Sequence, residues 1–200
     1  MRNIIPFALI LLLCACAHNS TDKASSDANV PEIVQIAPDV ALTMPNPADL
    51  GHSVEAVQLV TAHYGDQNFA FEAHISVTPE HFLLIGLDLM GRKIMTINWT
   101  KEGTDFETAP WVPSQLRAKN ILADIVLLYW PETIVKKGLV GSLVKLVADR
   151  YSRTIMSGHK KVWQANYQMN TKHDLWSGQL HYRNIAWGYE FNVQSTETNP

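Results

Sequence analysis

Apolar and polar residues alternate along most of the chain between residue 57 and residue 108. Between Gln67 and Val77 every second residue is apolar, which is typical of a strand with one buried face. Short turn sequences such as Gly65–Asp66 and Met90–Gly91–Arg92 separate these stretches and favour hairpins. The pattern therefore predicts an antiparallel meander of strands over Val57–Tyr64, Gln67–Val77, His81–Leu89, Lys93–Thr100 and a short segment ending at Thr108.

The spacing of apolar residues changes after a proline-containing corner. From Ser114 to Trp130 they recur at three- and four-residue intervals, which predicts an amphipathic helix with Lys119 and Asp124 on its polar side. Pro131 ends this helix, because proline removes a backbone donor and clashes with the preceding turn. A second, short helix is predicted over Glu132–Lys137.

Strand-like patterns return near the end of the chain. The segment Leu143–Asp149 fits either a strand or a helix. Two hairpins are then predicted, one from Arg153–Met156 and Lys161–Met169, the other from Trp176–Ala186 and Tyr189–Gln194. Strands, then helices, then strands again predict a mainly β fold with α (α+β). We expect one strongly curved antiparallel sheet, a half-barrel closed by one or two helices.

The first residues resemble an export signal. Arg2 precedes an apolar run from Ile4 to Leu13, which is too short for a membrane-spanning helix of ~20 residues. The sequence Leu13-Cys14-Ala15-Cys16 is similar to a bacterial lipobox, in which cleavage precedes a cysteine that is then acylated. We expect a signal peptide over residues 1–15 and lipidation at Cys16; Cys14 fits less well because two leucines precede it. The alternative is an ordinary cleaved signal with an incidental cysteine.

A tether and a folded domain are expected to follow. Residues 16–50 are rich in small polar residues and proline, which predicts a lipidated N-terminus and a flexible linker. Ile33–Ile36 is apolar enough to form a short strand against the domain. Residues 51–200 are predicted to form the half-barrel. Ala17, by resemblance to the sorting rule of bacterial lipoproteins, favours the outer membrane and its periplasmic face.

Charge and cysteine content narrow the function classes. The formal net charge is −3, and loss of Arg2 with the signal makes it one unit more negative, which argues against a nucleic-acid partner. The two cysteines both lie at the signal cleavage region, so the mature domain would contain no free thiol. Its stability must then come from an apolar core.

Motifs for catalysis or metal binding are not found. Ser142 lacks the flanking glycines of a nucleophile elbow, since Val140 and Val144 occupy those positions. The eight histidines show no metal-ligand spacing; His63 and His74 lie on neighbouring predicted strands and are expected to be solvent-facing. No pair of carboxylates stands out as an acid/base couple. We therefore predict no catalytic residue, no metal and no cofactor.

Large apolar and aromatic side chains are the remaining signal. The chain contains six tryptophans, which fit either a packed core with cross-strand pairs or the wall of an apolar ligand cavity between sheet and helix. The apolar stripes of the predicted strands and helix point to candidate lining residues Phe71, Ile97, Trp99, Leu122, Ile125 and Tyr129.

Several segments resemble a known family. They are Gly86–Met95, the Trp111–Pro113 corner, Ile121–Pro131 and Gly188–Val193. The resemblance covers roughly residues 55 to 195. They are similar to bacterial outer-membrane lipoproteins encoded beside aryl polyene and fatty-acid-like biosynthesis genes, whose members look like the lipoprotein receptor LolB.

This resemblance implies a LolA/LolB-like half-barrel whose apolar hollow accepts acyl chains. It also implies a cargo-transfer hairpin at Leu89, Met90 and Gly91, with Met90 in place of a protruding leucine.

The expected function is that of a non-enzymatic lipoprotein on the periplasmic face of the outer membrane. It would bind an acylated or polyene-lipid or lipoprotein cargo in an apolar cavity and aid its transport or localisation. The alternative is a lipoprotein that binds no cargo and scaffolds a biosynthetic or export assembly. An enzyme acting on acyl chains lacks a residue to carry the chemistry.

Overall fold

The computed structural model describes residues 32–112, 117–169 and 174–198. Within them the fold is mainly β, with two short α-helices, so the predicted α+β class is confirmed. The strands and helices are β1 (Ile33–Ala37), β2 (Val40–Thr43), η1 (Pro47–Leu50), β3 (Val54–Tyr64), β4 (Gln67–Val77), β5 (His81–Asp88), β6 (Lys93–Thr100), β7 (Gly103–Thr108), α1 (Ala118–Tyr129), α2 (Glu132–Gly138), β8 (Leu139–Val140), β9 (Val144–Ala148), β10 (Ser152–Ser157), β11 (Lys160–Met169), β12 (Gly178–Asn184) and β13 (Tyr189–Glu197).

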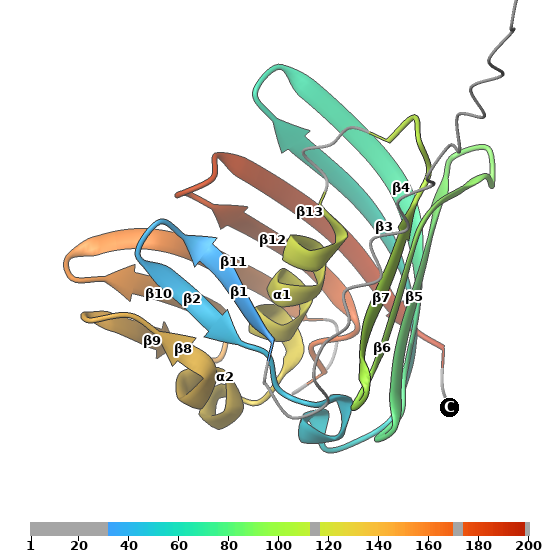
Figure 1. The fold of residues 1–200 in the computed structure, drawn as a ribbon. Coiled ribbons are helices and arrows are strands. Elements are labelled where there is room, and N and C mark those ends of the chain that lie inside the picture. The colour runs from blue at the N-terminus through green and yellow to red at the C-terminus, as the bar shows by residue number, and fades with distance from the viewer. Residues whose placement is uncertain (1–31, 113–116, 170–173, 199–200) are drawn as a thin grey trace, which may run out of the picture.

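Ten strands form one large antiparallel sheet that is not closed into a barrel (Figure 1). Its order is β7-β6-β5-β4-β3-β13-β12-β11-β10-β9, so the N-terminal meander and the C-terminal hairpins join where β3 pairs with β13. The alternation in sequence is reproduced as burial: Phe71, Ala73 and Ile75 of β4 are buried and face the same side. The ambiguous segment 143–149 contains strand β9, because it pairs with β10 at the sheet edge.

Helix α1 lies in the concave face of this sheet, with the β1–β2 hairpin beside it (Figure 1). The helix contacts β1, β6 and β7, and its residues 121–129 are all buried. The predicted amphipathic character is therefore wrong in one respect: Asp124, expected on a polar face, is 1% exposed. Asp124 faces the large sheet instead, where Trp163 of β11 and Tyr189 of β13 donate hydrogen bonds to its carboxylate.

The predicted tether does not extend to residue 50. Residues 32–50 form β1, β2 and η1, and their apolar side chains Val34, Ile36 and Leu42 are at most 2% exposed. β2 pairs with β8 after α2, which fixes this hairpin to the domain. The short strand expected at Ile33–Ile36 is confirmed, whereas a flexible linker reaching residue 50 is not. Residues 1–31, including the predicted signal peptide and Cys16, lie outside the described residues.

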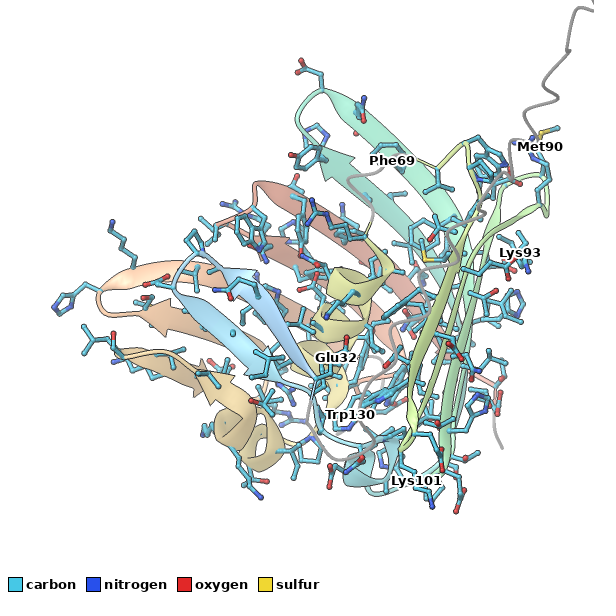
Figure 2. The ribbon with its side chains drawn as sticks, viewed as in Figure 1. Glu32, Phe69, Met90, Lys93, Lys101 and Trp130 are labelled. Carbon is cyan, nitrogen blue, oxygen red and sulfur yellow. The ribbon has the colours of Figure 1, made fainter. Side chains whose placement is uncertain are left out.

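An aromatic cluster of Phe82, Trp99 and Trp130 lies within the core. The ring centroids of Trp99 and Trp130 are 5.6 Å apart, and Phe82 lies 6.1 Å from Trp99 and 6.3 Å from Trp130. The indole Nε1 of Trp130, labelled in Figure 2, donates to the backbone carbonyl of Asn46 at 3.2 Å, so the cluster also holds the segment after β2. Tilted aromatic pairs of this kind add about 0.5–1.5 kcal/mol beyond the burial of their area.

Candidate functional site

Side chains of the sheet hold the C-terminal end of α1. Nη1 of Arg153, on β10, donates to the carbonyls of Leu127 and Trp130, each at 2.8 Å. The hydroxyl of Tyr167, on β11, donates to the carbonyl of Leu128 at 2.9 Å. The last carbonyls of a helix have no partner within the helix, and a cation beside them also interacts favourably with the helix dipole. This end of α1 is therefore fixed to the sheet.

The N-terminal end of α1 is held differently. Arg117 occupies the N-cap and makes no side-chain capping hydrogen bond. In the first turn, Lys119 Nζ lies 2.8 Å from Glu32 Oε1, and both side chains are substantially exposed. Exposed ion pairs of this kind contribute about 0–1 kcal/mol. The two ends of the helix thus differ in the strength of their polar attachment.

Asp124 stands in the middle of α1, in a buried polar network. Its Oδ1 accepts a hydrogen bond from Trp163 Nε1 at 3.0 Å, and its Oδ2 accepts one from the Tyr189 hydroxyl at 2.6 Å. Asn184 Nδ2 in turn donates to the Tyr189 hydroxyl at 3.2 Å and to the backbone carbonyl of Ile36 at 2.9 Å. The network joins α1 to β11, β12, β13 and β1.

The protonation of Asp124 is set by its burial. Removal from water raises its pKa from 3.8 to about 7, because the two hydrogen bonds that favour the carboxylate offset only part of the desolvation. Burial of the Tyr189 hydroxyl, together with the nearby Asp124 charge, holds the pKa of Tyr189 well above its ordinary value. Asp124 therefore changes its proton occupancy near neutral pH, inside the helix that fills the concave face.

A small pocket lies between the N-terminal half of α1 and the ends of β3, β4 and β13. Asp124 contributes to its lining, and Arg117 and Asn120 line it from the N-terminal end of the helix. Its free volume of about 20 Å³ is room for a single water molecule. Its walls are mostly apolar and aromatic, formed by Ala62, Tyr64, Phe69, Ile121, Tyr189 and Phe191. Figure 2 places Phe69 near the β3–β4 turn.

The six cavity-lining residues predicted from sequence lie elsewhere, in the packed core. Phe71, Ile97, Trp99, Leu122, Ile125 and Tyr129 are all buried and belong to one apolar cluster. Tyr129 stacks on Trp176 with ring centroids 3.9 Å apart, and its hydroxyl accepts a hydrogen bond from Gln58 Nε2 at 2.9 Å. These six side chains pack α1 against the sheet, and a different set of side chains forms the pocket.

Sequence reasoning missed Tyr64, Phe69, Tyr189, Phe191 and Asp124 as pocket residues. The available signal was Asp124, a single carboxylate within the otherwise apolar stretch from Ile121 to Tyr129. A charge in such a run is costly to bury, so its presence marks a position that needs hydrogen-bond partners.

The predicted cargo-transfer hairpin is exposed and well formed. Leu89 is 71% exposed and Met90 83% exposed, and Gly91 takes a φ of 78°, a left-handed value that favours glycine. Asp88 Oδ1 accepts hydrogen bonds from the backbone N–H groups of Met90 and Arg92, each at 2.9 Å. Figure 2 shows Met90 at the tip of the β5–β6 hairpin. Its role in delivering cargo stays a prediction.

Other residues singled out in the sequence are not brought together. His63 Nδ1 lies 2.8 Å from Asn68 Oδ1, and His74 Nε2 lies 2.6 Å from Glu72 Oε1, so the two histidines have separate partners. Across residues 32–112, 117–169 and 174–198, no group of three or more His, Cys, Asp or Glu side chains is placed to hold a metal ion. In the same ranges, no helix has the length and apolarity needed to cross a membrane.

Fold and site together define an open antiparallel sheet with a helix in its concave face and a small aromatic pocket beside a buried carboxylate. Residues 55–197 match the family described as "Protein of unknown function (DUF3261)". Because this span covers more than half of the chain, the protein belongs to that family. Comparison with curated proteins gives no match.

Proposed function

We propose that this protein is a lipoprotein of the outer membrane that carries an acylated or polyene-lipid cargo on the periplasmic side. The observation that carries the proposal is the pocket lined by Tyr64, Phe69 and Ile121 at the N-terminal end of α1. Small-ligand sites are typically concave and apolar, with a few polar groups that fix orientation. The pocket has that composition, and a larger volume opens if the helix end moves away from β3 and β4.

The unequal attachment of α1 supports such a movement. Arg153 and Tyr167 fix the C-terminal end through buried hydrogen bonds, whereas Arg117 and Lys119 at the other end face solvent. A helix held this way pivots about its C-terminal part, so a chain enters beneath its first turn. Transfer of apolar cargo surface from water then contributes about 25 cal/mol per Å².

Arg117 suggests the polar end of the cargo. Its side chain lines the mouth of the pocket and is exposed, beside Asn120. A guanidinium binds carboxylate or phosphate in a bidentate manner. An acyl chain with an anionic head group therefore fits, with its tail directed towards Phe191 and Ile121.

The remaining parts of the proposal rest on the sequence. The lipobox-like Leu13–Cys16 supports lipidation at Cys16 and, with Ala17, anchoring in the outer membrane. An open curved sheet with a helix in its hollow supports a LolA/LolB-like half-barrel as the finer fold class. Protein partners in export or biosynthesis belong to the same proposal.

The alternative function is a scaffold that binds no cargo. It is favoured by one observation: in this state the pocket holds only about 20 Å³ of free space, and the residues around α1 are packed. A scaffold needs no movement of α1, so the two functions differ in whether an acyl chain enters beneath the helix.

Titration with cis-parinaric acid, a fluorescent polyene fatty acid, tests the carrier function. Phe69→Glu places a charge in the pocket wall and is expected to weaken binding at least tenfold, which is about 1.4 kcal/mol. Phe106→Glu is the matched control, since Phe106 lies on the same sheet, is 38% exposed and is not in the pocket wall. Equal affinities of the two variants, or no binding by the wild type, would contradict the proposal.

A further inference from the structure

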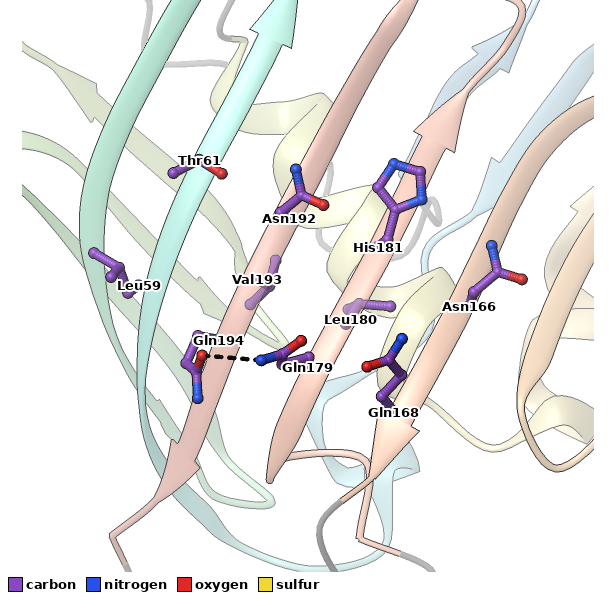
Figure 3. Close-up of a pocket in the computed structure, with 10 residues that line it drawn as sticks. All are labelled: Leu59, Thr61, Asn166, Gln168, Gln179, Leu180, His181, Asn192, Val193 and Gln194. Atoms are coloured by element: carbon purple, nitrogen blue, oxygen red, sulfur yellow. Dashed lines mark hydrogen bonds between the residues drawn. The ribbon is translucent and has the colours of Figure 1, made fainter.

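The outer face of the sheet carries a hollow that the proposed function does not use. It lies over β3, β13, β12 and β11 and encloses about 350 Å³ (Figure 3). Successive residues of a strand point to opposite faces. Gln58 and Tyr167 reach the α1 side, so their neighbours Leu59, Asn166 and Gln168 face away from the helix.

Cross-strand register arranges the side chains of this hollow in two parallel rows. Each row takes one residue from each of the four strands, and adjacent members are direct partners in the antiparallel pairing. The first row is Thr61, Asn192, His181 and Asn166, and the second is Leu59, Gln194, Gln179 and Gln168. With neighbouring strands about 4.8 Å apart, each row spans roughly 14 Å.

The rows are rich in amides and poor in charge. Five of the ten lining residues are Asn or Gln, and none is Asp, Glu, Lys or Arg. In the described part of the chain, one side-chain hydrogen bond joins members of the rows, from Gln179 Nε2 to Gln194 Oε1 at 3.5 Å (Figure 3). At the edge, His181 Nε2 lies 3.7 Å from Glu190 Oε2. The remaining amides thus present donors and acceptors to solvent.

This composition is unusual for a solvated sheet face. Asparagine is depleted in strands, yet Asn166 and Asn192 occupy interior positions of β11 and β13. Charges appear outside the hollow on the same strands, where Arg183 Nε lies 4.0 Å from Glu190 Oε2. Because the lining of the hollow carries no formal charge, it favours an uncharged ligand. Each primary amide both donates and accepts hydrogen bonds, so the ligand should do both as well.

A second hollow continues the first towards the end of β11. The two share Gln168, Gln179 and Gln194, and the second is also lined by Tyr151, Tyr167 and Met169. Tyr151 is 56% exposed, and the Arg150 guanidinium lies over its ring, 5.3 Å from the centroid. The exposed part of the ring offers a surface for an apolar ring of a ligand, with a hydroxyl for hydrogen bonding. The amides and the exposed tyrosine thus line one extended groove.

We infer that this amide-lined groove binds a neutral oligosaccharide. Hydroxyl and acetamido groups of sugars both donate and accept hydrogen bonds, so they match the Asn and Gln side chains of the two rows, while a ring face packs on Tyr151. The groove and the α1 pocket lie on opposite faces of the sheet, and this inference does not depend on cargo binding at α1. A sugar bound here would position the domain beside a glycan.

An NMR titration tests the inference. The full chain with Cys16→Ser is titrated with triacetylchitotriose and, separately, with maltotriose. We expect shifts of the Asn and Gln side-chain amide signals with at least one sugar, at a Kd on the order of 1 mM. The double variant Asn192→Val with Gln179→Val is expected to weaken this binding at least tenfold. Valine suits a strand, so the fold is retained.

Gln164→Val is the matched control, because Gln164 lies on the same face of β11 but not in the groove. Its titration should equal that of the wild type. Absence of shifts at ten times the expected Kd with both sugars would overturn the inference. Equal affinity of the double variant and the control would also overturn it, as would tighter binding of a trisaccharide of uronic acids than of either neutral sugar.

Discussion

The free energy of unfolding is expected to fall by several kcal/mol as pH rises from about 4 to about 7. The cause is Asp124, whose pKa burial raises from 3.8 to about 7. In this range the folded protein keeps the proton that the unfolded chain has released, so folding binds protons and stability decreases with pH. With about 1.4 kcal/mol per pKa unit, roughly 4 kcal/mol is the upper bound. Above about pH 7 the contribution becomes constant.

Carboxylates whose pKa is lowered in the folded protein affect its stability outside the range from about pH 4 to about pH 7. Hydrogen bonds from the Arg92 and Met90 backbone lower the pKa of Asp88, and those from Tyr151 and Ser152 lower that of Asp149. Such carboxylates stabilise the fold above their unfolded pKa, and that contribution is lost as pH falls through the lower folded value. Their effect therefore has the opposite sign and lies below about pH 4.

Urea unfolding at a series of pH values checks the prediction, with Asp124→Asn as the reference. The variant keeps an oxygen acceptor for Trp163 or Tyr189 but cannot titrate. The difference in unfolding free energy, wild type minus variant, should decrease from pH 4 to pH 7 and then level off. A constant difference across this range, or one that increases, would show that the buried carboxylate is not coupled to folding.

Arg153→Met is expected to lower the free energy of unfolding by about 3 kcal/mol. The substitution keeps the apolar stem but leaves the carbonyls of Leu127 and Trp130 buried without their donor. An unsatisfied buried group costs about 1–3 kcal/mol, and the favourable interaction of the cation with the C-terminal end of α1 is lost as well. Arg153 is 7% exposed, so water does not readily replace it.

Arg183→Met is the matched control, because Arg183 is an exposed arginine on β12 of the same sheet. It is expected to change stability by less than about 1 kcal/mol, since its ion pair with Glu190 is at the surface. Chemical denaturation of both variants at one pH gives the comparison. A loss for Arg153→Met no larger than that for Arg183→Met would remove the support for a fixed C-terminal end of α1.

Much of the fold could be predicted from the sequence, because strands with one buried face carry a strict two-residue period. The hairpins of β3 with β4 and of β12 with β13 follow from this period and their short turns. For residues 32–50 the sequence pattern is misleading, because the prolines in that region predict a linker. They instead mark the turns and η1 of a segment whose apolar residues Val34 and Leu42 are buried.

The site was harder to predict because core and cavity walls share one sequence pattern. An apolar stripe such as Leu122, Ile125 and Tyr129 identifies the buried face of a helix, but not whether the space opposite is filled. The observed pocket arises where α1 meets the ends of three strands, including Phe69 of β4 and Tyr189 of β13. That meeting depends on the β3–β13 pairing between distant parts of the chain, which periodicity does not encode.

The proposed carrier function requires that an acyl or polyene chain enters beneath the N-terminal end of α1. The most direct measurement is mass spectrometry with visible absorbance on an organic extract of the Cys16→Ser protein, purified from the periplasm of its native host. We expect a co-purifying acylated or polyene species in near-stoichiometric amount, reduced in the Phe69→Glu variant and retained in Phe106→Glu. A stable wild-type protein that carries no lipid would contradict the carrier function and favour the scaffold.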